Sequence, residues 1–124
     1  MLIPHRSHEA LESIPLLKFD LEAEIAQLRE GDQQAGRNSR TLMKTPDLRV
    51  VLVTATKGSY LKEHRADGSV TILAVTGAIR LKTEQGDIDL NAGELLALDR
   101  GLPHDVEALS DCAFLVTIGW PKKV

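Results

Sequence analysis

Two histidines, His64 and His104, are the residues whose surroundings most suggest chemistry. His64 lies between Gly58 and Gly77, and His104 closes a segment that begins at Gly93. Imidazole is a common metal ligand. Two imidazoles alone hold a metal poorly unless carboxylate or water completes the coordination shell. The pair therefore predicts either two residues of one shared pocket or two satisfied histidines of a β-rich core.

The neighbours of His64 add polar groups to the predicted pocket. Side chains alternate along a strand, so Tyr60 and Lys62 are expected on the same face as His64. A lysine cation and a phenol hydroxyl beside the imidazoles would suit a small anionic or carbonyl-bearing ligand. Alternatively, Lys62 is a strand-edge side chain that reaches solvent. Asp67 is out of phase with His64, but a turn at Asp67 and Gly68 could redirect its carboxylate toward the pocket as a third metal ligand.

The elements that would position these residues are mostly strands. Short β-branched runs alternate with turn residues, and no helical pattern lies between them. Strands are predicted over residues 48–56, 70–76, 79–84, 88–90, 95–98 and 113–118. This spacing favours an all-β antiparallel sandwich or barrel. The runs 48–53 and 70–75 are apolar at nearly every position, so both of their faces need cover.

One amphipathic helix is predicted before the strands, over residues 20–30. Apolar residues recur there at helical spacing: Leu17, Leu21, Ile25 and Leu28. Asp20 is a suitable N-cap and Gly31 a suitable terminator. We expect the helix to lie across the outside of the domain or against a partner subunit. The polar, glycine-bearing segment 31–40 is predicted to be a loop, which divides the chain into an N-terminal segment, 1–40, and a barrel domain, 41–124.

The two histidine segments together resemble the paired motifs of the cupin superfamily, G-x5-H-x-H-x3,4-E-x6-G and G-x5-P-x-G-x2-H-x3-N. The matching residues are Gly58, His64 and Gly77 in the first motif, and Gly93, Gly101 and His104 in the second. The resemblance covers about residues 42–119. It implies a single small cupin-type β-barrel, a double-stranded β-helix or jelly roll, with the helix added at its N-terminus.

The metal ligands of this pattern are mostly missing. In the family, three histidines and a glutamate hold a divalent metal, but here Ala66, Val70 and Ala108 replace the second histidine, the glutamate and the final asparagine, and Asp99 replaces the proline. The resemblance thus implies at most a degenerate site. A divalent metal such as Fe, Mn, Ni or Zn would have His64 and His104 as ligands, with Asp67 as the third.

Three kinds of function are compatible with this pattern. The first is a binding module that holds a small molecule in the barrel pocket without a complete catalytic metal site, and it is the one we expect. The second is a metal-dependent cupin enzyme, a dioxygenase, isomerase or decarboxylase, with an atypical ligand set. The third is a structural or interaction domain whose barrel is filled by side chains.

Composition limits the partners and the compartment. A net charge of −3 gives no electrostatic reason to expect nucleic acid, and no apolar run is long enough for a membrane span. The single Cys112 excludes an intrachain disulfide, and the N-terminus lacks the pattern of a signal peptide. We therefore expect a cytoplasmic protein. We also expect a homodimer, because the two-sided apolar strands need cover.

Overall fold

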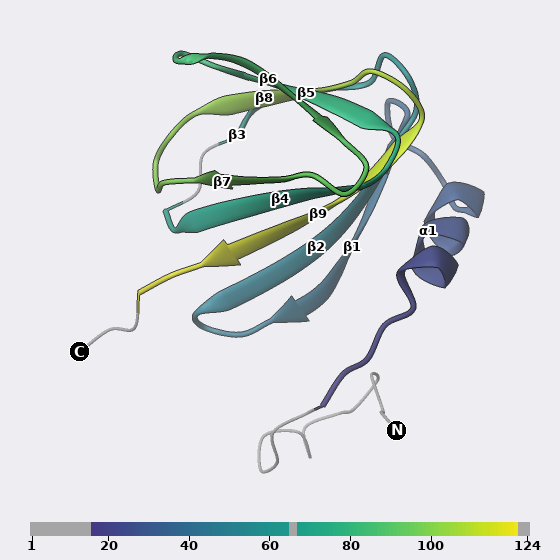
Figure 1. The fold of residues 1–124 in the computed structure, drawn as a ribbon. Helices are drawn as coiled ribbons and strands as arrows, with labels where there is room; N and C mark the ends of the chain where they lie inside the picture. Colours follow the sequence, from purple (N-terminus) through teal and green to yellow (C-terminus); the bar gives the residue numbers. More distant parts are fainter. Residues whose placement is uncertain (1–15, 65–66, 122–124) are drawn as a thin grey trace.

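Two antiparallel sheets face each other in the computed structural model, which describes residues 16–64 and 67–121, with backbone only at 63 and 64 (Figure 1). The larger sheet has the strand order β1-β2-β9-β4-β7, and the smaller has the order β3-β8-β5-β6. The elements are α1 (Leu21–Glu30), β1 (Arg37–Lys44), β2 (Leu48–Ala55), β3 (Tyr60–His64), β4 (Ser69–Thr76), β5 (Ala78–Thr83), β6 (Gly86–Asn91), β7 (Leu95–Leu98), β8 (His104–Ala108) and β9 (Cys112–Gly119). The predicted all-β jelly roll with an N-terminal helix is confirmed.

The main core lies between the two sheets. Along β4, Val70, Ile72 and Ala74 are buried, whereas the residues between them are only partly buried. This period of two places one set of side chains inside the sandwich. Phe114 of β9 and Leu81 of β5 reach the same interior from opposite sheets. Burial of these apolar surfaces is the main force that holds the sheets together.

The predicted helix is confirmed, and it packs on the outer face of the larger sheet (Figure 1). The Asp20 carboxylate accepts a hydrogen bond from the Ala23 N–H at 3.3 Å, as an N-cap does. Ile25 and Leu28 are buried against Leu42 and Leu52 in a second core cluster. The helix thus gives outer cover to β2, one of the two strands predicted to need cover on both faces.

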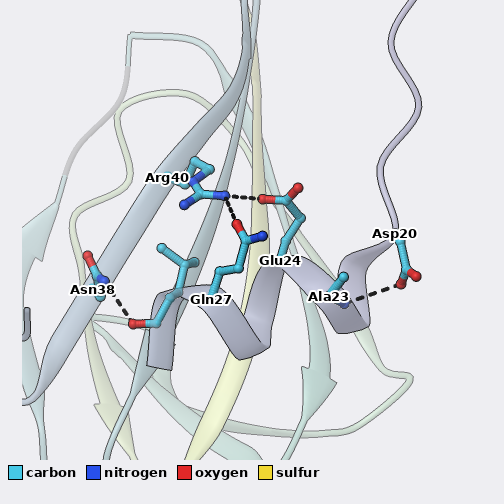
Figure 2. Close-up of polar contacts among 7 residues, drawn as sticks. Asp20, Ala23, Glu24, Gln27, Asn38 and Arg40 are labelled. Carbon is cyan, nitrogen blue, oxygen red and sulfur yellow. Dashed lines mark hydrogen bonds and ion pairs between the residues drawn. The ribbon is translucent and has the colours of Figure 1, made fainter. Parts of the chain in front are cut away.

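Polar contacts align the helix with the edge strand β1 (Figure 2). Arg40 donates hydrogen bonds to the carboxylate of Glu24 and, at 2.9 Å, to the side-chain amide oxygen of Gln27. The Asn38 amide donates to the Leu28 carbonyl at 2.8 Å, near the C-terminal end of α1. The helix therefore docks in one orientation, through its apolar face and these side chains together.

The prediction of a loop over residues 31–40 is wrong at its C-terminal end, because β1 begins at Arg37. Residues 37–41 are polar and at least partly exposed, so no apolar alternation marks them as a strand. Their backbone pairs with β2, with Arg37 opposite Ala55 and Thr41 opposite Val51. Pairing with a neighbour, rather than burial of side chains, makes this segment a strand. It crosses the predicted division of the chain at residue 40.

The glycines of the two histidine segments are turn residues. Gly58, Gly77, Gly93 and Gly101 all have positive φ, between 71° and 90°. At Gly77 the backbone is also closely packed, because a Cβ atom there would lie 2.2 Å from the Asp111 carbonyl oxygen. Only glycine fits both conditions.

In the described part of the chain, no helix has the length and hydropathy that a membrane span requires.

Candidate functional site

A cavity of about 580 Å³ opens between the two sheets of the sandwich. Its walls are mainly apolar and come from both sheets: Val51, Val53, Leu61, Val70, Ile72, Val106, Phe114, Val116 and Ile118. Polar side chains complete the lining: Asp32, Gln34, Arg37, Asn38, Ser39, Arg49 and His104. A cavity of this size with a few polar groups has the character of a small-molecule site.

His104 lies at the start of β8, where the loop from β7 enters the smaller sheet, and it is only 8% exposed. Its Nδ1 is 3.1 Å from the Leu102 carbonyl oxygen, which can only accept a hydrogen bond. When the imidazole is neutral, this contact favours the proton on Nδ1 and leaves the basic lone pair on Nε2. His104 takes part in another interaction in addition to this hydrogen bond. The loop carbonyl thus orients the imidazole in the cavity wall.

The backbone pairing places His64 directly opposite His104, on neighbouring strands β3 and β8. The side chain of His64 and all of Ala66 lie outside the described residues. Asp67 is exposed in the turn that follows. Val70, at the position of the family's glutamate, is 4% exposed and lines the cavity. Among described residues, no three His, Cys, Asp or Glu side chains group as a metal site would require.

Tyr60 and Lys62 are exposed and are not among the residues that line the cavity. The Tyr60 hydroxyl donates to the Asp105 carboxylate at 2.7 Å, and the Lys82 ammonium lies 5.5 Å from the centre of the Tyr60 ring. The β3 register shifts between Leu61 and His64, which interrupts the alternation from which the common face was predicted. Leu61, which lies opposite the buried Val106, is the residue of this strand that lines the cavity.

Arg49 is a cavity residue that the sequence pattern did not identify. It lies in β2 next to Val50 and Val51, and its Cζ is 5.8 Å from the centre of the Trp120 ring. The Arg49 Nε is buried and has no hydrogen-bond partner among the described residues. A charged residue within an otherwise apolar strand was the signal available in the sequence.

Arg49 and His104 lie at the same end of the sandwich, in opposite sheets. In the backbone register, Arg49 of β2 lies opposite Ile118 of β9. Ile118 also lies opposite Val70 of β4, and Val70 lies opposite Leu98 at the end of β7. A short loop, residues 99–103, then leads to His104. This is the end at which β9 finishes (Figure 1). The cavity thus has a cationic group and an imidazole near one end, apolar walls along both sheets, and the polar side chains of residues 32–39, Arg37 among them, farther along.

Solved structures share this arrangement of strands. A conserved protein of unknown function from Streptococcus pyogenes matches with a TM-score of 0.68 and 22% identity, over 73% of this chain and 80% of that one. A cupin superfamily protein from Desulfitobacterium hafniense matches with a TM-score of 0.68 and 15% identity, over 73% of this chain and 84% of that one. The chain has the cupin fold. A cupin-2 domain protein from Shewanella frigidimarina also matches this cupin barrel, with a TM-score of 0.67 and 16% identity, over 82% of this chain and 94% of that one.

Sequence comparison adds no closer relationship. No protein-family model matches this cupin-fold chain, and no curated protein matches it significantly. At the identities above, the structural likeness extends to the fold alone. A cupin barrel carries many unrelated activities, so a function has to be argued from the cavity itself.

Proposed function

We propose that this cupin-fold protein binds a small molecule in the cavity between its sheets, without a complete catalytic metal site. The observation that carries the proposal is the cavity of about 580 Å³, with apolar walls and a buried His104. Pockets for small ligands fall within about 300–1,000 Å³ and combine apolar walls with few polar groups. A barrel filled by its own side chains would leave no such space.

The described cavity residues do not fit a catalytic metal. His104 and Asp32 are the cavity's only described side chains of the types that usually bind divalent metals. They come from different parts of the fold, since Asp32 follows α1 and His104 begins β8. A site of the family type needs three or four convergent ligands. A ligand held by the apolar walls and by hydrogen bonds suits this lining better.

Thermal unfolding with and without added compounds tests the proposal, because a ligand that binds only the folded state raises the apparent stability. Small carboxylates and carbonyl compounds are expected to raise the melting temperature. A cavity-blocking variant, Val116→Phe, should lose this response. Thr117→Phe is the matched control, since Thr117 is the next residue of β9 and does not line the cavity.

Metal analysis separates this proposal from a metal-dependent enzyme. Protein purified without chelator should contain less than about 0.1 equivalent of Fe, Mn, Ni or Zn, because two histidines alone make a weak site. A stoichiometric metal that is lost in His104→Ala would overturn the metal-free proposal. An unchanged melting temperature with every compound, in protein shown to be folded, would overturn the binding proposal itself.

A further inference from the structure

We propose that Arg49 is the anion anchor of the cavity and that it selects small monocarboxylates with an apolar body as ligands. This inference rests on the proposed binding function and names its ligand class. It starts from a guanidinium that is placed in the cavity wall and makes no hydrogen bond or ion pair within the described part of the chain.

An unpaired donor in the interior is costly. A buried polar group without a partner costs about 1–3 kcal/mol, and more when the group is charged. The other arginines near α1 and on β5 show the usual solution, since Arg40 pairs with Glu24 and Arg80 with Asp89. Arg49 has no carboxylate in that role, and its buried Nε faces no acceptor among the described residues. A ligand carboxylate would supply the missing acceptor.

Trp120 holds the guanidinium without using its hydrogen-bond donors. The Arg49 Cζ lies 5.8 Å from the centre of the indole ring, within the range of a cation–π contact. Trp120 is itself fixed, because its backbone N–H donates to the Asp47 carbonyl at 3.0 Å. Gly68 also packs closely there, since a Cβ at this glycine would lie 3.2 Å from Trp120 Cδ1. This contact engages the cation and leaves its N–H groups for an anion.

The rest of this end of the cavity favours a single negative charge. A guanidinium matches a carboxylate through two parallel N–H···O bonds. The nearest cavity residues, Val51 in the same strand and Ile118 opposite Arg49 in β9, are apolar. Lys44 lies opposite Arg49 in β1, but it is exposed and does not line the cavity. The second cavity arginine, Arg37, pairs with Ala55, six residues along β2, at a backbone distance of about 20 Å. Arg37 also donates to the Tyr60 carbonyl at 2.9 Å. Among the described residues, no second cation lines this end of the cavity, so the site suits a carboxylate better than a dianion such as phosphate.

The experiment compares branched C5–C8 monocarboxylates with their neutral amides and with inorganic phosphate. Trp120 is the only tryptophan of the chain, so its fluorescence reports directly on the Arg49 site. Carboxylates should change this fluorescence saturably and raise the melting temperature, and the amides should bind about 10- to 100-fold more weakly, because a hydrogen bond to a charged group is lost. Phosphate should have no saturable effect.

Two variants test the role of Arg49. Arg49→Met should lose the preference for carboxylate over amide, and the ligand-free variant should melt no lower than the wild type, because a buried donor without a partner is removed. Arg100→Met is the matched control, since it removes the same charge from an exposed loop position outside the cavity at the same end of the sandwich. It should keep the full preference.

The possible results separate this inference from the binding proposal. If the carboxylates and their amides bind equally well, or if Arg49→Met keeps the preference, Arg49 is not the anchor although the cavity binds ligands. A lower melting temperature of ligand-free Arg49→Met, with an unchanged carboxylate preference, would make Arg49 a structural partner of Trp120. If phosphate binds in place of carboxylates, the assigned ligand class is wrong.

Discussion

The Tyr60 hydroxyl donates a 2.7 Å hydrogen bond to the Asp105 carboxylate, across strands β3 and β8 on the outer side of the smaller sheet. Asp105 follows His104 in β8, so these successive residues face opposite sides of the smaller sheet. His104 lines the cavity, whereas Asp105 meets an exposed tyrosine. The pairing of Tyr60 with Asp105 therefore marks which side of β3 faces outward.

The titration of Tyr60 tests this contact. The hydrogen bond to Asp105 is the main cause that raises the pKa of Tyr60 above 10.0, with smaller contributions from desolvation and nearby carboxylates. Since Tyr60 is the only tyrosine, ultraviolet absorbance follows it alone. The midpoint should lie above that of a free tyrosine and fall toward it in Asp105→Asn. Because the folded-state pKa is raised, the contact stabilises the fold below about pH 10 and is lost as pH rises further. Equal midpoints in both proteins would contradict the contact.

Cys112 is expected to be unreactive in the folded protein. It is fully buried, and desolvation raises its pKa to about 11, so little thiolate forms near neutral pH. A thiol reagent at about pH 8 should modify it only as fast as the protein unfolds. The same protein in denaturant, where the thiol is accessible, is the control. Rapid modification under native conditions would show that Cys112 is not buried at the start of β9.

Gly77 should be far less tolerant of substitution than Gly93. Both have positive φ, but only at Gly77 would a Cβ meet neighbouring atoms, at 2.2 Å from the Asp111 carbonyl oxygen. Gly77→Ala is expected to lower the free energy of unfolding by about 2–5 kcal/mol, from backbone strain and overpacking together. Gly93→Ala should lower it by about 1 kcal/mol, from strain alone. Denaturant unfolding gives both values, and similar losses would contradict the close packing at Gly77.

The docking of α1 can be measured at Leu28, which is 3% exposed against the larger sheet. Leu28→Ala should lower the free energy of unfolding by about 2–5 kcal/mol, as the removal of a buried leucine side chain does. Leu16→Ala is the control, since Leu16 is 80% exposed and should change stability by less than about 0.5 kcal/mol. Equal effects would show that the helix is not held on the sheet in solution.

The homodimer stays a prediction, and we propose the uncovered side of the larger sheet as its interface. Leu95 is 61% exposed and pairs with Leu73, which in turn pairs with Leu115. Light scattering should show a dimer for the wild type and a monomer for Leu95→Glu. Ile88→Glu changes a 41% exposed residue of β6 in the other sheet and should leave the dimer intact. A monomeric wild type would overturn the proposal.

Most strands could be predicted because burial gives them a readable pattern. Residues 48–56, 70–76 and 95–98 differ from β2, β4 and β7 by at most a residue at an end. Segments held by pairing rather than burial were harder to recognise. β1 is the example, because it is mostly polar. The strand β8 was missed although His104, Val106 and Ala108 are buried in alternation, because it is only five residues long.

The candidate site was predictable only in part. The glycine spacing led to His104, because positive-φ turns leave a trace in the sequence as glycines. Strand alternation wrongly placed Tyr60 and Lys62 in the cavity with His64. The register shift in β3 separates them from His64 in the pairing, and residue types do not signal such a shift. Arg49 was hidden in an apolar run, and its partner Trp120 lies far along the chain.

The sequence by itself determined the β-rich fold, the amphipathic helix and the turns, because local periodicity and backbone preferences act between neighbouring residues. Only the tertiary structure decided which side chains share the cavity. Arg49 and His104 come from different sheets, and the register of several strands brings both side chains to the same cavity. That register is set by long-range pairing and packing, which short-range sequence patterns do not encode.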